Sequence, residues 1–526
     1  MTMRTLGIFL TALGALAATG ELLGLAFPTA RWFFETSRDV PLLHYHLSDS
    51  PVFPWFGWLS TALLITGGLF LMLRSWLGGP RNPVTEQRIR RFRAIKRGYF
   101  SLVILLVLGG LAGLDQVVVG KRALAVKYQG KWSFPAFQPG ALKNADYGIT
   151  GELAEAPADY RELKRRLEHA GSGRVILPPI PYDPTGDSLP ERSGPLVQRE
   201  GLYFESGASQ PFSGMAASYH DVERSLIHLR YSMRHGVRSG PVDGYDTAGT
   251  AVYSGEYKYG TLVADRYSGS DSKDHFLALP SSDLRAVKYH PAPPMPGEGN
   301  WLGTTSQGYD VLAYLYGGLQ VNFKAGLIYL PIIYLIGISI GMMMGFFGGW
   351  FDLIVQRIIE IFSNMPFLFV VIIFSNMVPE RYKGLPVILT ILIAFGWMGM
   401  TFLMRTAAYR DRERDYIAAA RVLGAGTPRI LFLHLLPNTV AILVTLVPFT
   451  LSGLIFSLTS LDYLGFGLTA ESATWGRLLN DGLANLSAPW LVTYTFIVLV
   501  GMLVLITFVG EAVREAIDPK KFTFYR

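Results

Sequence analysis

The chain of 526 residues contains no cysteine. Disulfide bonds, thiol catalysis and cysteine-ligated metal sites are therefore excluded, although this absence identifies no redox compartment. The histidines do not replace such sites, because His220, His228 and His235 are separated by eight and seven residues and form no HExxH-type ligand pair. We expect these histidines to be structural or solvated, and we expect no metal site.

Charged residues are also scarce. They make up 17% of the chain, against about 25% in ordinary soluble domains, whereas apolar residues make up 50%. A net charge of +7 could suit nucleic acid, but the basic residues lie beside hydrophobic runs, where they report orientation in a bilayer. We predict a membrane protein with several spans and no nucleic-acid site.

A phosphate-binding loop is missing as well. No GxxxxGK[ST] motif occurs, and the Gly120–Lys121 pair has Asp115 where the first glycine is needed. The chain is therefore not expected to hydrolyse ATP.

The hydrophobic runs are long enough to count as membrane spans, since about 20 helical residues cross about 30 Å of hydrocarbon. Eight runs qualify: Leu6–Phe27, Phe56–Leu73, Tyr99–Val119, Ala325–Phe347, Leu353–Met377, Leu385–Met404, Thr439–Ser460 and Leu491–Val513. The first could instead be a cleaved signal peptide, because Arg4 precedes an apolar stretch with small residues around Ala15 to Ala18. We favour an uncleaved span, because a second run and a basic loop come next.

Basic residues predict the orientation of the spans. The stretch from Arg74 to Arg97 contains eight Lys or Arg and one acid, which places it in the cytoplasm. Counting spans from there puts both termini and residues 405–438 inside, and residues 121–321 outside. Arginines in 405–438 and basic residues near the C terminus agree with this topology.

Composition divides the chain into four parts. Residues 1–80 form a hairpin of two spans, 81–120 a basic segment with the first core span, 121–300 an outer insert, and 301–526 the remaining spans. The insert is rich in Gly, Pro, Tyr and Ser and has short alternating runs, so we expect a mainly β fold. Its charged segment Asp159–His169 is the best candidate helix.

One predicted span carries charges that are costly in lipid. Asp352, Arg357 and Glu360 lie within or beside the fifth run. Arg357 and Glu360 are three residues apart on one helix face, so they could pair with each other or line a polar path through the membrane; a proton relay is undecided. Pro366 is expected to kink or restart this span.

The charged segment 405–438 interrupts the spans with two predicted helices. On the first, one face carries mainly small residues that would let another surface approach closely: Tyr416, Ala419, Ala420 and Leu423. The glycines at 424 and 426 predict its end.

The second predicted helix of this segment begins with Thr427 as its cap and Pro428 as its first residue. Pro437 and Asn438 are expected to end it. The pattern alone also fits an ordinary cytoplasmic loop with an amphipathic helix.

This segment resembles the EAA loop of ABC-importer permeases. The pattern of two small residues, a glycine and a Leu-Pro pair is matched by Ala419, Ala420, Gly424, Leu436 and Pro437. Five neighbours are similar to the oligopeptide, dipeptide and microcin C branch of that family: Asp415, Tyr416, Arg421, His434 and Asn438. Ala418 departs from the family by standing where its name places glutamate.

Other segments extend the resemblance in chain order over roughly residues 86–526. The start at Arg90, the segment Asn300–Gly318 and the loop Ser457–Trp490 are similar to peptide permeases, and Asp310–Tyr316 is expected to be a short interfacial helix. Part of the insert, Gly201–Tyr267, resembles MORN-type repeats, which are β-hairpins marked by glycine and aromatic residues.

The resemblance implies a mainly α, polytopic protein with a type I importer core, about eight spans in all, in a bacterial inner membrane. It implies a permease subunit that moves peptides by alternating access and makes or breaks no bond. Implied partners are ABC ATPase subunits that bind ATP and Mg and dock on 405–438, a second permease subunit, a substrate-binding protein outside, and membrane lipid. Alternatives are an ion-coupled secondary transporter and a membrane-anchored protein with a functional outer domain.

Overall fold

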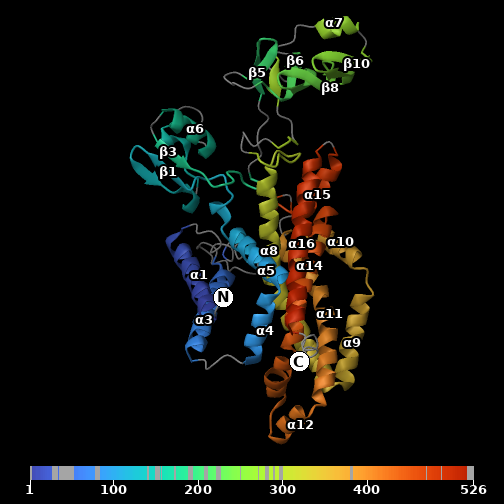
Figure 1. The fold of residues 1–526 in the computed structure, drawn as a ribbon. Helices are drawn as coiled ribbons and strands as arrows, with labels where there is room; N and C mark the ends of the chain where they lie inside the picture. The colour runs from blue at the N-terminus through green and yellow to red at the C-terminus, as the bar shows by residue number, and fades with distance from the viewer. Residues whose placement is uncertain are drawn as a thin grey trace. The chain divides into compact units, whose positions relative to one another are not determined.

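The computed structural model divides the chain into two compact units, each considered separately (Figure 1). The first comprises Met1–Asp187, Pro296–Leu302 and Tyr309–Arg526, and the second comprises Ser188–Met295 and Gly303–Gly308. Residues 121–187 of the expected insert thus group with the helices. The structure describes residues 3–25, 34, 53–77, 83–138, 141–148, 154–155, 157–170, 173–186, 193–205, 211–220, 227–248, 250–269, 272–278, 284–287, 291–294, 300–379, 383–469, 471–486 and 488–517.

The first unit is mainly helical, because a helix satisfies the backbone hydrogen bonds of a long apolar run within the run itself. They are α1 (Met3–Leu23), α3 (Trp55–Leu77), α4 (Pro83–Ala94), α5 (Lys96–Gly113), α8 (Val311–Phe347), α9 (Gly349–Ser363), α10 (Phe367–Met377), α11 (Leu385–Arg412), α12 (Asp415–Val422), α13 (Thr427–Arg429), α14 (Leu436–Tyr463), α15 (Trp475–Ala484) and α16 (Pro489–Ile517). Short 3-10 turns lie at Asp115–Val117, Pro135–Phe137 and Asn144–Tyr147.

Seven of the eight hydrophobic runs lie wholly or mostly on one of these helices, and the fifth lies on the pair α9 and α10. The third run extends past the end of α5, and residues 26–27 of the first run lie outside the described residues. Among the described residues, six helices are long and apolar enough to cross a membrane, or seven if the bent pair counts as one span. The apolar part of α1 is shorter, covering Gly7–Leu23. The pair α9 and α10 bends by 79° where Pro366 caps α10, which confirms the predicted break.

Helix α8 is one continuous helix of 37 residues that begins at Val311. The expected short interfacial helix from Asp310 is therefore wrong, because it continues into the next span without a break. Asp310 is the N-cap, and its carboxylate accepts a 2.9 Å hydrogen bond from the Ala313 amide. At about 1.5 Å per residue the helix is about 55 Å long, which exceeds the hydrocarbon thickness.

A ridge of glycines lets α11 pack directly on α8. Gly337, Gly341 and Gly345 recur every four residues, so they lie on one face. A Cβ at Gly341 would lie 2.5 Å from the Thr401 carbonyl oxygen, and one at Gly345 would lie 2.5 Å from the Arg405 carbonyl oxygen. The absence of side chains on this ridge thus fixes how closely the two helices approach.

A small α/β module follows α5. Strands β1 (Ala125–Tyr128), β2 (Lys131–Ser133) and β3 (Gly173–Ile176) form an antiparallel sheet in the order β2-β1-β3. Helix α6 (Tyr160–Ala170) packs against it and confirms the helix predicted for this part of the insert.

The second unit is built on an eight-stranded sheet, which confirms a β-rich insert. Its order is β10-β9-β8-β7-β6-β11-β4-β5, and every neighbouring pair is antiparallel. The elements are β4 (Ser193–Arg199), β5 (Leu202–Glu205), β6 (Gly214–Tyr219), β7 (Ile227–Arg234), β8 (Val237–Tyr245), β9 (Ala251–Lys258), β10 (Thr261–Tyr267), β11 (Arg285–Val287) and helix α7 (Lys273–Ala278).

Glycines close three hairpins of this sheet by a common geometry. The two-residue turns that end in Gly201, Gly236 and Gly260 have positive φ at both positions. That geometry matches the right-handed twist of paired strands and requires glycine at its second position. In each of these hairpins the glycine is the last residue of the turn.

One histidine is buried in the core of the second unit. His228 is almost fully buried, and its Nε2 donates a 2.9 Å hydrogen bond to the Phe276 carbonyl oxygen, so Nδ1 carries no proton in the neutral ring. Within the described part of the chain, Nδ1 has no hydrogen-bond partner. Burial lowers the pKa of His228, and the nearby His220, with its ring centroid 4.5 Å away, lowers it further.

This buried ring predicts acid sensitivity of the second unit. In the unfolded chain His228 binds a proton near pH 6.5, whereas the folded ring binds one only at lower pH. Protection of β7 amides from hydrogen exchange in the full chain is therefore expected to be maximal above about pH 6.5 and to fall as pH decreases below it. His228→Phe should flatten this profile, and an unchanged profile in that variant would contradict the assignment.

Candidate functional site

Segment 405–438 lies at one end of the first unit and includes helix α12. Helix α12 covers Asp415–Val422, and Gly424 follows it with φ +78°, a conformation that favours glycine. This confirms the predicted helix end. The two residues before the glycine, Val422 and Leu423, are 88% and 86% exposed. The helix therefore ends in an apolar knob, which we define as Val422 and Leu423, and which nothing in the described chain covers.

The predicted residues of this segment divide between its surface and its interior. Tyr416, His434 and Leu436 are partly buried. Ala420 is buried with Ile417 and Ile430, so it packs α12 onto the next helical turn and is not on the free surface. The exposed members are Asp415, Ala419, Arg421, Gly424, Pro437 and Asn438.

The second predicted helix is longer than expected. Gly426, rather than Thr427, is the N-cap of α13, and Pro437 does not end the helix. A π-helical stretch, Ile430–Leu435, joins α13 directly to α14. Proline lacks an amide hydrogen and clashes with the carbonyl four residues earlier, and the wider π turn before Pro437 accommodates it.

Helix α12 is attached to the end of α8. The Arg421 guanidinium lies over the Phe346 ring at 5.1 Å, and Phe346 also packs against the cluster of Ile417, Ala420 and Ile430. These contacts join α12 to the end of α8, just before the turn into α9.

A buried ion pair holds that turn against α11. Asp352, only 4% exposed, accepts hydrogen bonds from Arg405 Nε at 2.5 Å and Arg405 Nη2 at 2.6 Å, a bidentate arrangement. The Tyr409 hydroxyl donates to the same carboxylate at 2.5 Å. Arg412 donates to the Gly345 carbonyl oxygen at 3.3 Å and lies 5.0 Å from the Tyr409 ring centre. We call Asp352, Arg405 and Tyr409 the clamp.

The predicted Arg357–Glu360 pair is present. Arg357 Nη1 lies 2.5 Å from Glu360 Oε2, and Gln356 donates to the other carboxylate oxygen at 3.0 Å. Arg357 is exposed and Glu360 partly so. The pair therefore lies on a surface of α9, whereas Asp352 of the clamp is buried.

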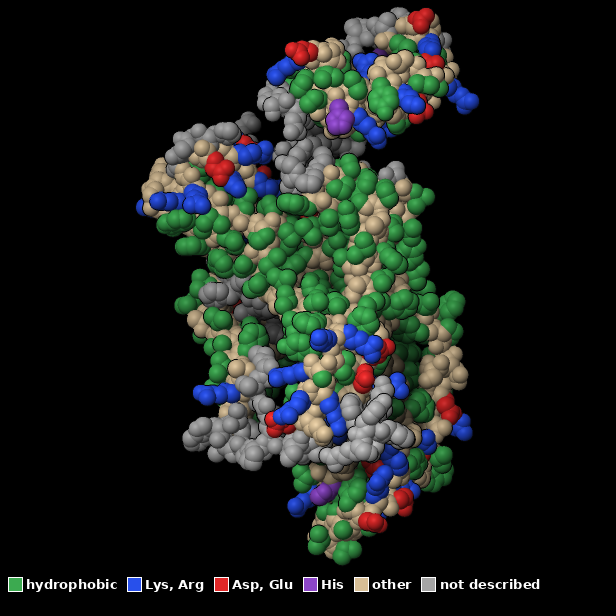
Figure 2. Space-filling view, in the orientation of Figure 1, with side chains coloured by type: hydrophobic (Ala, Val, Ile, Leu, Met, Phe, Trp, Pro, Cys, Tyr) green, Lys and Arg blue, Asp and Glu red, His purple; other side chains and the backbone are tan. Residues whose placement is uncertain are grey.

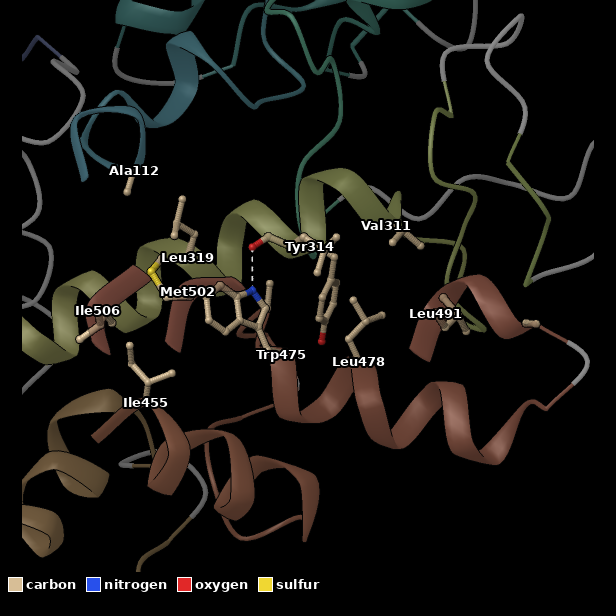
Figure 3. Close-up of a cluster of buried hydrophobic side chains, with 13 residues drawn as sticks. Ala112, Val311, Tyr314, Leu319, Ile455, Trp475, Leu478, Leu491, Met502 and Ile506 are labelled. Carbon is tan, nitrogen blue, oxygen red and sulfur yellow. Dashed lines mark hydrogen bonds between the residues drawn. The ribbon is translucent and has the colours of Figure 1, made fainter. Parts of the chain in front are cut away.

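At the opposite end of the first unit, α15 packs against α8 through Trp475. Its indole Nε1 donates a 2.9 Å hydrogen bond to the Leu315 carbonyl oxygen, which joins α15 to α8 (Figure 3). Gly318 allows this contact, since a Cβ there would lie 2.4 Å from Trp475 Cδ1. Arg477 donates to the carbonyls of Thr469 and Leu468, which fixes the loop before α15. Two segments that resemble peptide permeases, 300–318 and 457–490, thus meet here.

Between these ends the surface is mainly hydrophobic, and Lys and Arg gather toward the end that carries α12 (Figure 2).

Comparison with known proteins identifies the family of the chain. Residues 337–523 match the family described as "Binding-protein-dependent transport system inner membrane component". The "Peptidoglycan transport system permease protein YejE" of Agrobacterium fabrum is 31% identical over 84% of this chain and 94% of its own length. The chain belongs to this family of transport permeases.

Two further relatives place the permease among named transport systems. The "Inner membrane ABC transporter permease protein YejE" of Escherichia coli is 32% identical over 84% of this chain and 98% of its own length. The "Oligopeptide transport system permease protein OppC" of Mycobacterium tuberculosis is 31% identical over 43% of this chain and 77% of its own length. The match at 337–523 contains the clamp, α12 and the apolar knob.

Sequence reasoning missed two parts of this site in the permease. It named Asp352 as a costly charge but did not identify Arg405 as its partner, since 53 residues separate them. It placed Leu423 on a face with small residues and did not single out Val422, although two adjacent apolar residues before a helix-ending glycine were a usable signal.

Proposed function

We propose that this permease is the membrane subunit of an ATP-driven peptide importer. Support comes from its relatives, because one is named for peptidoglycan transport and another for oligopeptide transport. Peptides are the chemistry common to both names, so peptide fragments of peptidoglycan and simple oligopeptides are the first substrates to test. The subunit moves its substrate by alternating access and catalyses no reaction.

The observation that carries this proposal is the apolar knob on a chain that lacks a phosphate loop. Leaving Val422 and Leu423 exposed forgoes about 1.5–3 kcal/mol of burial energy for each side chain, and a docking partner would recover it. That partner is an ABC ATPase, which binds ATP and Mg. Its movement reorients the spans through the contacts of α12 with α8 and through the clamp.

The proposed topology places α12, α4 and both termini in the cytoplasm and residues 121–321 outside. The basic residues before α5 and around α12 support this orientation by the positive-inside rule. A substrate-binding protein delivers the peptide on the outer side.

A second permease subunit completes the path. Arg357 and Glu360 lie on a surface of α9, where contact with lipid would cost about 2.5–3.5 kcal/mol for each charge. This surface therefore faces the second subunit or the water-filled path between the subunits.

The proposal predicts uptake that depends on an ATPase. In proteoliposomes containing this permease, a second permease subunit, candidate ATPases and a binding protein, labelled peptide should accumulate only when ATP and Mg are supplied to the ATPase. Omitting the ATPase is the control and should abolish uptake. Peptide accumulation driven by an ion gradient without any ATPase would instead establish a secondary transporter.

A further inference from the structure

One face of the β2-β1-β3 sheet carries mainly exposed side chains, and Ala125 at the start of β1 is its buried exception. The strand register sets Lys127 between Trp132 on β2 and Arg174 on β3. Alternation along the strands places Ile176, the partner of Ala125, on the same face, and Phe134 follows Trp132 by two residues. We call Lys127, Trp132, Phe134, Arg174 and Ile176 the open face.

The open face is both apolar and cationic. Trp132, Phe134 and Ile176 are exposed large hydrophobic residues, and Lys127 and Arg174 are exposed cations. The Lys127 ammonium lies 5.8 Å from the centre of the Trp132 ring. None of the three strands contains Asp or Glu, so no acid on the sheet neutralises these two cations.

The other side of the module has the opposite character. Val126 and Val175 point into a core with Leu163 and Leu167 of α6, which covers that face of the sheet (Figure 1). The outer surface of α6 carries ion pairs between Glu162 and two arginines and between Lys164 and Glu168. The module therefore presents a charged, water-facing layer on one side and the open face on the other.

The module is tied to the end of a membrane span. It follows α5 directly, and a parallel bridge joins Val119 to Ile180, with the Gly120 amide donating to the Ile180 carbonyl oxygen at 3.1 Å. The exposed apolar surface of α5 continues to Leu111 and Leu114, at the start of the connection to β1. Strand β1 begins at Ala125, a short connection after the last of these exposed apolar residues.

We propose that the open face rests on the anionic lipid headgroups of the bilayer. Lys127 and Arg174 bind lipid phosphates, while Trp132 and Phe134 enter the interfacial layer, where aromatic rings and cations are favoured together. Charge complementarity and continuity with α5 select lipid as the occupant. The contact holds the outer module at a fixed height and is independent of the substrate and of the ATPase.

The absence of cysteine makes a site-specific test simple. Ile176→Cys places a single fluorescent label on the open face, and Glu168→Cys places a matched label on the outer surface of α6. The full chain is incorporated in nanodiscs of phosphatidylcholine, with or without phosphatidylglycerol. Quenching by a nitroxide-bearing lipid and by aqueous iodide is then measured. We expect lipid quenching and iodide shielding only at residue 176, both stronger with phosphatidylglycerol.

Removing the two cations tests the headgroup contact. Lys127→Ser combined with Arg174→Ser should lower the ratio of docked to undocked module in phosphatidylglycerol about 30-fold, which corresponds to about 1 kcal/mol for each cation. Phe134→Cys provides a second label on the face if Ile176→Cys perturbs β3. Equal iodide quenching at 176 and 168 would overturn the proposal. Protection that appears only when a substrate-binding protein is added would assign the face to that protein instead.

Discussion

Replacing Asp352 with alanine is expected to destabilise the permease by about 3–5 kcal/mol, because it leaves a partly buried guanidinium without its carboxylate. Arg405 loses two hydrogen bonds, and the Tyr409 hydroxyl loses its acceptor. The change in unfolding free energy is measured by titrating the purified chain from mild detergent into sodium dodecyl sulfate. Asp352→Asn keeps the shape but not the charge, and it should give an intermediate loss.

Glu360→Ala provides a matched control for the clamp. It removes an acid from the same helix α9, but its partner Arg357 is exposed, so the expected loss is about 0–1 kcal/mol. Exchanging the charges, Asp352→Arg with Arg405→Asp, should recover part of the stability lost in Asp352→Ala. The assignment of the clamp fails if Asp352→Ala is no less stable than Glu360→Ala.

The clamp is also expected to affect how ATP hydrolysis is coupled to transport. It joins the start of α9 to the end of α11, and α11 leads into α12 through two residues. If α12 moves with the ATPase, the clamp makes α9 and α11 move together. Asp352→Asn should therefore lower peptide uptake per ATP hydrolysed, whereas ATPase binding to α12 should be retained.

The sequence was sufficient for features that depend on local chemistry. Spans follow from apolar runs, the end of α12 from Gly424, and the Arg357–Glu360 pair from a spacing of three residues. The clamp depends instead on how α8, α9 and α11 pack, and Asp352 has several arginines in the sequence as equally plausible partners. The glycine ridge on α8 lets α11 approach closely, and Arg405 on α11 then bonds to Asp352.

The same limit applies around the α12 segment, where Pro437 does not end the helix as predicted. Pro437 has the local properties of a helix terminator, yet the π-helical stretch before it lets the helix continue into α14. Ala420 has the small side chain expected of a docking surface, but it faces Ile417 and Ile430. A small residue on a helix permits close approach on whichever side the neighbour lies, and the sequence alone does not identify that side.

Replacing Leu423 with aspartate is expected to abolish stable binding of the ATPase to the permease. Leu423 is 86% exposed beside Val422, and a partner that covers it would have to bury an unpaired carboxylate. The lost burial alone is about 1.5–3 kcal/mol, a roughly 10- to 150-fold loss of affinity, and the buried charge increases it. The measurement is co-purification of candidate ATPases and their peptide-stimulated hydrolysis, with membrane insertion of the variant checked in parallel.

Leu486→Asp is the matched control, because Leu486 is 78% exposed and lies after α15. The 28-residue helix α14, about 42 Å long, separates the two ends of the core, so this control should leave ATPase binding intact. Gly424→Asp tests the backbone separately, since φ +78° strains a substituted residue although a Cβ there meets no described atom within 4 Å. After glycine, asparagine is the residue found at this helix-ending position, so Gly424→Asn should retain more ATPase binding than Gly424→Asp. Normal ATPase binding by both Leu423→Asp and Gly424→Asp would place the docking surface elsewhere than on the apolar knob.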